Sequence, residues 1–186
     1  MKTLIFQTIV EEISLDNLPL PWRDFDLKSF SKNKTLWDFQ QKAIENAIKG
    51  LYLYYQQKFD FEESESLDVN NQRKEHLFEL YQLNGLNVSL DYNLKKERKI
   101  NKLLSEYYPQ EDGKIRFSHF VNRASFWMAT GSGKTLIIVK LLEILKKLIE
   151  RKEIPQNDIL ILTCRDDLLE QLKEHIREFS SYQREI

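Results

Sequence analysis

The sequence has few of the features that mark secreted or membrane proteins. It holds a single cysteine, Cys164, among 186 residues. One thiol cannot build the disulfide framework on which small secreted domains depend. The N-terminal apolar segments, Leu4–Phe6 and Ile9–Val10, are short and are followed by two glutamates, unlike a signal peptide. No apolar run reaches the roughly 18 residues of a membrane span. We therefore expect a cytoplasmic protein without a membrane anchor.

An excess of charge of one sign is also missing. The chain has 28 basic and 29 acidic residues, for a net charge of −1. This balance neither indicates nor excludes nucleic acid, because a local basic patch is enough to hold a phosphate backbone. A length of 186 residues predicts one domain or slightly more, at roughly 100–200 residues per domain.

Glycine is scarce, with five in the whole chain, and two of them lie in one short segment, Met128–Thr135, which reads M-A-T-G-S-G-K-T. An apolar run enters this segment and a strongly apolar stretch leaves it. Gly131 and Gly133 permit backbone conformations closed to other residues and a close approach to a ligand. Backbone N–H groups at the start of the following helix attract anions. The segment therefore predicts a phosphate-binding loop.

Each polar residue of this loop has an expected role. The Lys134 ammonium would reach the β- and γ-phosphates of a nucleotide, and the Thr135 hydroxyl would ligate Mg²⁺. We expect the loop residues Thr130, Gly131, Ser132, Gly133, Lys134 and Thr135 to bind the phosphates. Met128 stands where the general phosphate-loop pattern begins with glycine. The alternative is a Gly-Ser turn that precedes a helix by chance.

The pattern around the loop predicts an α/β fold. One or two strands are expected between Ile115 and Met128, and an apolar helix from Thr135 to Lys152. Ile159–Leu162 is apolar on both faces, as in an interior parallel strand, and Asp166 or Asp167 would cap the next helix. Strand, loop, helix, strand and helix predict a layer with a right-handed crossover. Upstream, apolar spacing predicts a helix over residues 36–56.

Three blocks follow one another along the chain: Leu36–Ile44 (L-W-D-F-Q-Q-K-A-I), the phosphate loop as A-T-G-S-G-K-T, and Ile159–Gln171 (I-L-I-L-T-C-R-D-D-L-L-E-Q). They resemble, in the usual order, motifs of superfamily 2 helicases of the DEAD/DEAH-like group. The resemblance is greatest to the ATPase part of type III, and also type I, restriction enzymes. The first resembles the element that recognises adenine, the second motif I and the third motif Ia. Trp37 stands where arginine is common and Cys164 where proline is usual.

The resemblance implies roles for three further residues. Gln40 would read adenine, because a carboxamide both donates and accepts hydrogen bonds. Thr163 and Arg165 would contact the DNA backbone. The implied cofactors are ATP and Mg²⁺. The implied partners are double-stranded DNA, a methyltransferase or specificity subunit, and the remainder of the motor. The alternatives are an ordinary amphipathic helix with a spare glutamine at Gln40, and a turn with an exposed arginine at Arg165.

The fold class implied is α/β: the parallel sheet of a P-loop (RecA-like) NTPase with flanking helices, incomplete, with an N-terminal helical insertion. Residues 1–35 form an N-terminal segment. Residues 36–114 hold the adenine-recognition-like helix and the insertion, with a mobile loop near residues 60–75, where the composition is polar. Residues 115–186 form the first part of RecA-like ATPase domain 1.

What is missing limits the expected activity. Hydrolysis of ATP needs an aspartate to hold Mg²⁺ and a carboxylate to orient water, and no D-E-x-[HD] block follows Gln171. We therefore assign no catalytic residue and expect an N-terminal fragment of an ATP-dependent DNA helicase or translocase, inactive alone. It would be the restriction subunit of a type III restriction-modification system. The alternatives are a non-catalytic, truncated nucleotide-binding remnant and a P-loop NTPase outside the helicases.

Overall fold

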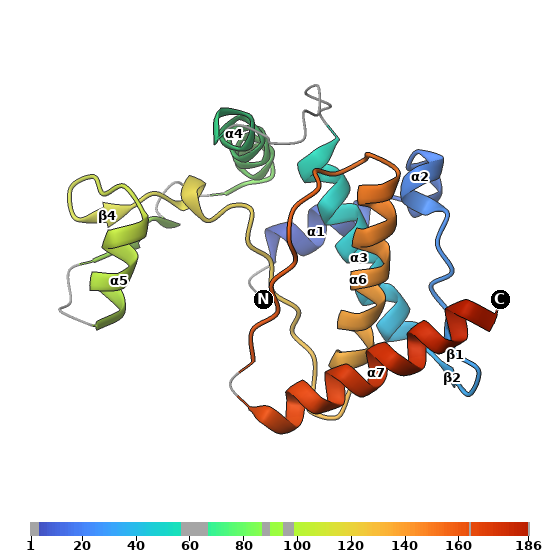
Figure 1. Cartoon of the computed structure of the whole chain (residues 1–186). Helices are drawn as coiled ribbons and strands as arrows, with labels where there is room; N and C mark the ends of the chain where they lie inside the picture. The colour runs from blue at the N-terminus through green and yellow to red at the C-terminus, as the bar shows by residue number, and fades with distance from the viewer. Residues whose placement is uncertain (1–3, 57–66, 87–89, 95–98, 164, 186) are drawn as a thin grey trace. The chain divides into compact units, whose positions relative to one another are not determined.

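The computed structural model describes residues 4–56, 67–86, 90–94, 99–163 and 165–185, and most of them are helical (Figure 1). The helices are α1 (Ile5–Glu12), α2 (Leu20–Arg23), α3 (Asp38–Tyr55), α4 (Leu67–Leu83), α5 (Lys99–Tyr107), α6 (Lys134–Glu150) and α7 (Asp166–Glu185), with 3-10 turns η1 (Leu15–Asn17) and η3 (Phe117–His119). The strands are β1 (Ser29–Ser31), β2 (Lys34–Thr35), β3 (Tyr92–Asn93) and β4 (Lys114–Ile115).

The chain divides into two compact units. One consists of residues 1–9 and 66–125, and the other of residues 10–65 and 126–186. The second unit contains the phosphate loop and the three blocks that resemble helicase motifs. Of the segment near 60–75, residues 60–66 lie outside the described part of the chain, and residues 67–75 belong to α4.

The expected parallel sheet is not present in the described residues. The strands form two antiparallel pairs, β1 with β2 and β3 with β4. The prediction of an interior strand over Ile159–Leu162 is wrong. Residues 155–163 have no regular secondary structure, and Leu160 and Leu162 are 80% and 82% exposed. A strand needs a neighbour for its backbone N–H and C=O groups, and no described strand pairs with this segment.

The main core lies in the second unit, where α6 packs against α3 and α7 (Figure 1). The helix expected from Thr135 is present as α6, and the helix expected over 36–56 as α3. The buried positions Ile137, Ile144 and Leu148 recur on one face of α6, at the spacing of a core-facing helix. They meet Ile44 and Ile48 of α3 in the same cluster.

A buried lysine joins α6 to two other elements. The Lys140 side chain is almost fully buried, and its ammonium donates to the backbone oxygen of Ser29 in β1 at 3.1 Å. The ammonium pairs with Glu143 at 2.8 Å and lies 5.1 Å from the ring centroid of Phe179 in α7. A buried charge is costly unless it is paired and hydrogen-bonded. These contacts satisfy Lys140 and connect α6 with β1 and α7.

A half-buried glutamate in the C-terminal half of α7 holds the β1–β2 hairpin. Glu178 accepts hydrogen bonds from the Ser31 hydroxyl at 2.6 Å and from the Lys34 ammonium at 2.5 Å. Burial by itself would raise the pKa of Glu178, but the hydrogen bonds donated by Lys34 and Ser31 prevail and lower the pKa below its ordinary value. The hairpin is therefore attached to α7 by a charged, hydrogen-bonded contact.

The other unit has a small aromatic core of its own. Tyr81 of α4 stacks on Phe6 with ring centroids 5.9 Å apart and meets Phe117 edge-on at 6.0 Å. Burial raises the pKa of Tyr81 to about 12. The insertion's aromatic side chains Phe78 and Tyr81 therefore take part in packing. Among the described residues, no helix combines the length and the apolar character of a membrane span.

Ile144 and Ile138 offer a matched test of this core. Ile144 is fully buried, whereas Ile138, on the same helix, is 40% exposed. Ile144→Ala is expected to lower the free energy of unfolding by about 2–5 kcal/mol, because it removes buried methyl groups and leaves a cavity. Ile138→Ala is expected to change it by about 0.5 kcal/mol or less. Urea denaturation followed by circular dichroism measures both. Equal losses would contradict the packing described for α6.

Candidate nucleotide-binding site

The phosphate loop turns sharply on two glycines. Gly131 and Gly133 have φ values of +78° and +73°, in the left-handed region that favours glycine. The Ser132 N–H donates to the Ala129 oxygen at 3.3 Å and closes the turn. Gly133 is the N-cap of α6. The N-terminal end of α6 therefore begins directly at the loop, as the sequence predicts.

The loop presents an open side to a ligand. A Cβ atom added to Gly131 would meet no heavy atom within 4 Å, and Thr130, Gly131 and Lys134 are exposed. The Ser132 hydroxyl oxygen is buried and has no hydrogen-bond partner. An unpartnered buried hydroxyl is costly unless a ligand or water satisfies it. Open space, a free hydroxyl and the start of a helix fit a phosphate group.

The Lys134 side chain folds back over the loop. Its ammonium donates to the backbone oxygens of Met128 at 2.9 Å and Ala129 at 2.6 Å. The charge is thereby held beside the loop while the side chain stays exposed. Backbone oxygens are neutral acceptors, and a phosphate oxygen makes a stronger, charge-assisted hydrogen bond. Lys134 is thus positioned to exchange these oxygens for a phosphate.

Gln40 lies directly against the loop. Its Oε1 accepts the Trp37 backbone N–H at 2.9 Å, and its Nε2 donates to the Ser132 backbone oxygen at 2.8 Å. The residue is 5% exposed. The bond to Trp37 is the contact of an N3 glutamine that reaches back to the N-cap of its helix. One acceptor lone pair and one donor hydrogen of the carboxamide are left for a ligand.

Gly133 is required by this arrangement. A Cβ atom on Gly133 would lie 2.5 Å from Gln40 Nε2, which is closer than real Cβ contacts. The glycine therefore serves two purposes: it permits the positive φ value and it leaves room for the carboxamide. Its second role gives no signal in the sequence, because Gln40 lies far from it along the chain.

A cavity of about 360 Å³ adjoins Gln40 and the loop. Its lining comes from the β1–β2 hairpin, the N-terminal end of α3 with its N-cap, the loop and the first turn of α6: Asn33, Lys34, Thr35, Trp37, Gln40, Ser132 and Leu136. Trp37 is 69% exposed, and an exposed aromatic ring offers a flat surface to a nucleobase. The hairpin residues could not be expected here from the sequence, because residues 1–35 contain no motif.

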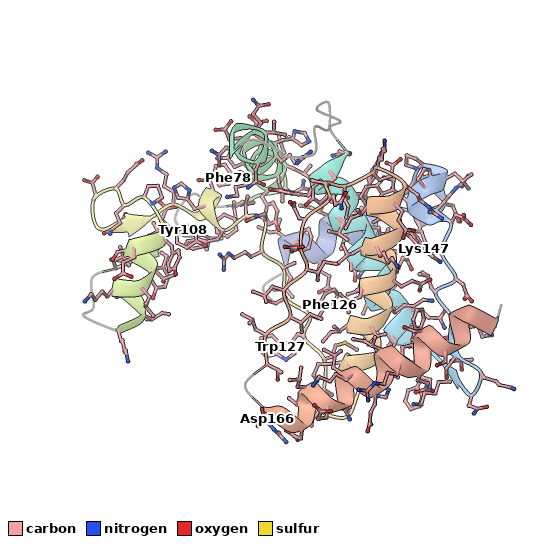
Figure 2. All side chains as sticks on the ribbon, in the orientation of Figure 1. Phe78, Tyr108, Phe126, Trp127, Lys147 and Asp166 are labelled. Carbon is pink, nitrogen blue, oxygen red and sulfur yellow. The ribbon has the colours of Figure 1, made fainter. Side chains whose placement is uncertain are left out.

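Thr135 and the motif Ia residues lie at the facing ends of α6 and α7. The Thr135 hydroxyl donates to Gln171 Oε1 at 3.2 Å. Thr163 and Arg165 precede α7 and are exposed, and the Arg165 N–H donates to the Thr163 hydroxyl oxygen at 3.4 Å. Figure 2 shows Asp166 at the first turn of α7.

Arg165 is held by a neighbouring carboxylate. Its Nε donates to Asp167 Oδ1 at 3.0 Å, and its Nη2 to Asp167 Oδ2. The hydrogen bonds raise the pKa of Arg165 and lower the pKa of Asp167. The pair is fully exposed, so water screens it strongly. A phosphate would compete with Asp167 for the guanidinium.

Mg²⁺ fits the site only together with a nucleotide. Within the part of the chain that the structure describes, no group of three or more His, Cys, Asp or Glu side chains could hold a metal ion. The Thr135 hydroxyl can supply one oxygen, and Mg²⁺ in such sites takes its other ligands from phosphates and water. The ion is therefore expected as part of the bound nucleotide and not as a resident metal.

Comparison with known protein families gives a match. The family described as "Type III restriction enzyme, res subunit" matches residues 33–186, which is more than half of the chain and includes every residue of the site. This family implies a P-loop helicase fold. Searches of curated proteins and of solved structures found no significant match.

The contact between Gly133 and Gln40 leads to a test. Gly131→Ala and Gly133→Ala both place alanine at a left-handed φ, at a cost of about 1–2 kcal/mol. Gly133→Ala is expected to destabilise the protein more, because its Cβ also displaces Gln40. In a Gln40→Ala background the difference between the two variants should shrink. Thermal denaturation measures the stability of each variant. If the two variants were equally stable, or if their difference were unchanged in the Gln40→Ala background, the contact between residue 133 and Gln40 would be contradicted.

Proposed function

The chain belongs to the family of type III restriction enzyme res subunits, and from this we propose that it binds ATP and serves in an ATP-dependent DNA helicase or translocase of a type III restriction-modification system. The observation that carries the proposal is the contact of Gln40 with the phosphate loop. The adenine-recognition-like residue and motif I meet in space, beside a cavity that has room for a base.

The residues divide the nucleotide between them. The nucleobase would enter the cavity between Trp37 and Gln40, and the remaining donor and acceptor of Gln40 would read its edge. The phosphates would lie over Gly131, with the Ser132 hydroxyl and loop N–H groups as donors. Lys134 would exchange two backbone oxygens for phosphate oxygens. Mg²⁺, when bound with the nucleotide, neutralises phosphate charge, and the Thr135 hydroxyl would be its protein ligand.

DNA and protein partners complete the proposal. Thr163 and Arg165 would contact the backbone of double-stranded DNA, and Arg165 would leave Asp167 to do so. The further partners are a methyltransferase or specificity subunit and the remainder of the motor. We propose a cytoplasmic location for this assembly. These points rest on the resemblance and on the exposure of Arg165.

Nucleotide binding is the activity proposed for these 186 residues by themselves. Hydrolysis needs carboxylates that hold Mg²⁺ and orient water, and no residue of this sequence is assigned to that role. The second candidate is a nucleotide-binding protein without catalysis. A P-loop NTPase outside the helicases is less well supported, because such an enzyme has no need of the Gln40 contact or of motif Ia.

Lys134→Ala tests the nucleotide site. The variant should bind a fluorescent ATP analogue at least about tenfold more weakly, since it loses charge-assisted hydrogen bonds to phosphate. Lys146→Ala is the matched control, because Lys146 lies on α6 with its side chain 78% exposed and should leave the affinity unchanged. Equal affinities of wild type, Lys134→Ala and Lys146→Ala would refute the assignment.

Arg165 and Asp167 test the DNA contact. Arg165→Ala should weaken binding to duplex DNA and reduce the slope of log affinity against log salt by about one. Asp167→Asn should strengthen binding, because it removes the carboxylate that competes for the guanidinium. Fluorescence anisotropy at several salt concentrations measures both. Arg177→Ala, on the exposed side of α7, is the control, and an equal loss in this variant would contradict a specific role for Arg165.

A further inference from the structure

A hydrogen bond connects the phosphate loop to the helix that follows motif Ia. The Thr135 hydroxyl donates to Gln171 Oε1 at 3.2 Å, although the two residues are 36 positions apart. Thr135 is in the first turn of α6, and Gln171 is in the second turn of α7. The two helices pack against each other (Figure 1). The predicted site residues include Thr135 but give Gln171 no role.

The direction of this hydrogen bond matters for metal binding. A threonine hydroxyl has one hydrogen to donate and two lone pairs. Because the hydrogen points to Gln171, both lone pairs stay available for another partner. A donor at that position would occupy a lone pair and compete with a cation. The residue next in sequence, Leu172, is buried in the core, so the rotation of α7 that directs Gln171 at Thr135 is fixed by packing.

We propose that Gln171 is a positioning residue for Mg²⁺: its carboxamide oxygen orients the Thr135 hydroxyl so that the hydroxyl oxygen faces the metal of a bound nucleotide. Partners of a metal ligand in the outer shell commonly act in this way, and their loss costs about 10–100-fold in metal affinity. This inference rests on the proposed nucleotide site.

The same contact links the nucleotide to the DNA-binding residues. The Leu169 N–H donates to the Arg165 oxygen at 3.2 Å, so Arg165 is joined to the helical ladder that carries Gln171. A metal that orders Thr135 would therefore order the first turns of α7, and with them the position of Arg165. The contact gives a physical route between the phosphate loop and motif Ia.

Two substitutions at Gln171 distinguish a positioning role in Mg²⁺ binding from a purely structural role in the fold. Gln171→Met keeps the length of the side chain but has no carbonyl oxygen, and Gln171→Glu keeps an acceptor. The 186-residue chain is titrated with a fluorescent ATP analogue in EDTA, and then with Mg²⁺ at saturating analogue. Gln171→Met should raise the apparent Kd for Mg²⁺ about tenfold and leave the affinity in EDTA unchanged. Gln171→Glu should stay close to wild type or bind Mg²⁺ more tightly.

A double-mutant cycle with Thr135→Ala identifies the partner. Once the hydroxyl is absent, Gln171→Met should have no further effect on the Mg²⁺ titration. Unchanged Mg²⁺ dependence in Gln171→Met, or an equal loss with and without Mg²⁺, would overturn the inference and leave the nucleotide site intact. Failure of the nucleotide site itself shows differently, as equal affinity of wild type and Lys134→Ala for the analogue in EDTA. Glu174→Gln, exposed on the same helix, is the control.

Discussion

The Gln40 carboxamide joins two parts of the chain that are 92 positions apart, and the candidate site depends on this contact. Its oxygen fixes the start of α3 through Trp37, and its nitrogen holds the phosphate loop through Ser132. The space it occupies exists because residue 133 is glycine. A buried carboxamide that lost either hydrogen bond would destabilise the fold. The bonds to Trp37 and to Ser132 are therefore both needed to keep Gln40 in this position. The cavity beside it is bounded by the same two segments and by the β1–β2 hairpin.

Two charged side chains connect the elements that surround the loop. Lys140 connects α6 with β1 and with Phe179 of α7, and Glu178 connects α7 with the hairpin that lines the cavity. The hydrogen bond between Thr135 and Gln171 lies where α6 packs against α7. The first turn of α6, which is proposed to receive the phosphates, is in this way attached to the elements proposed to bind the base and the DNA.

Features that depend on neighbours in sequence could be predicted, and those that depend on distant partners could not. The phosphate loop, α3 and α6 follow from glycine positions and helical spacing. The strand expected over Ile159–Leu162 is absent because apolar character does not supply a paired strand, and Leu160 and Leu162 are exposed. Figure 2 shows Phe126 and Trp127 on the segment that leads to the loop, likewise without regular structure. From the sequence alone, Lys140 would be taken for a surface residue, because its partners Ser29 and Phe179 lie far from it along the chain.

Nucleotide binding is expected to order the loop and, through Thr135 and Gln171, the start of α7. Amide hydrogen exchange, measured with and without ATP and Mg²⁺, tests it most directly. Protection should increase in residues 130–137 and in the first two turns of α7, while α4, in the other unit, keeps its exchange rates. Unchanged exchange in the loop, or a uniform change in both units, would contradict the account.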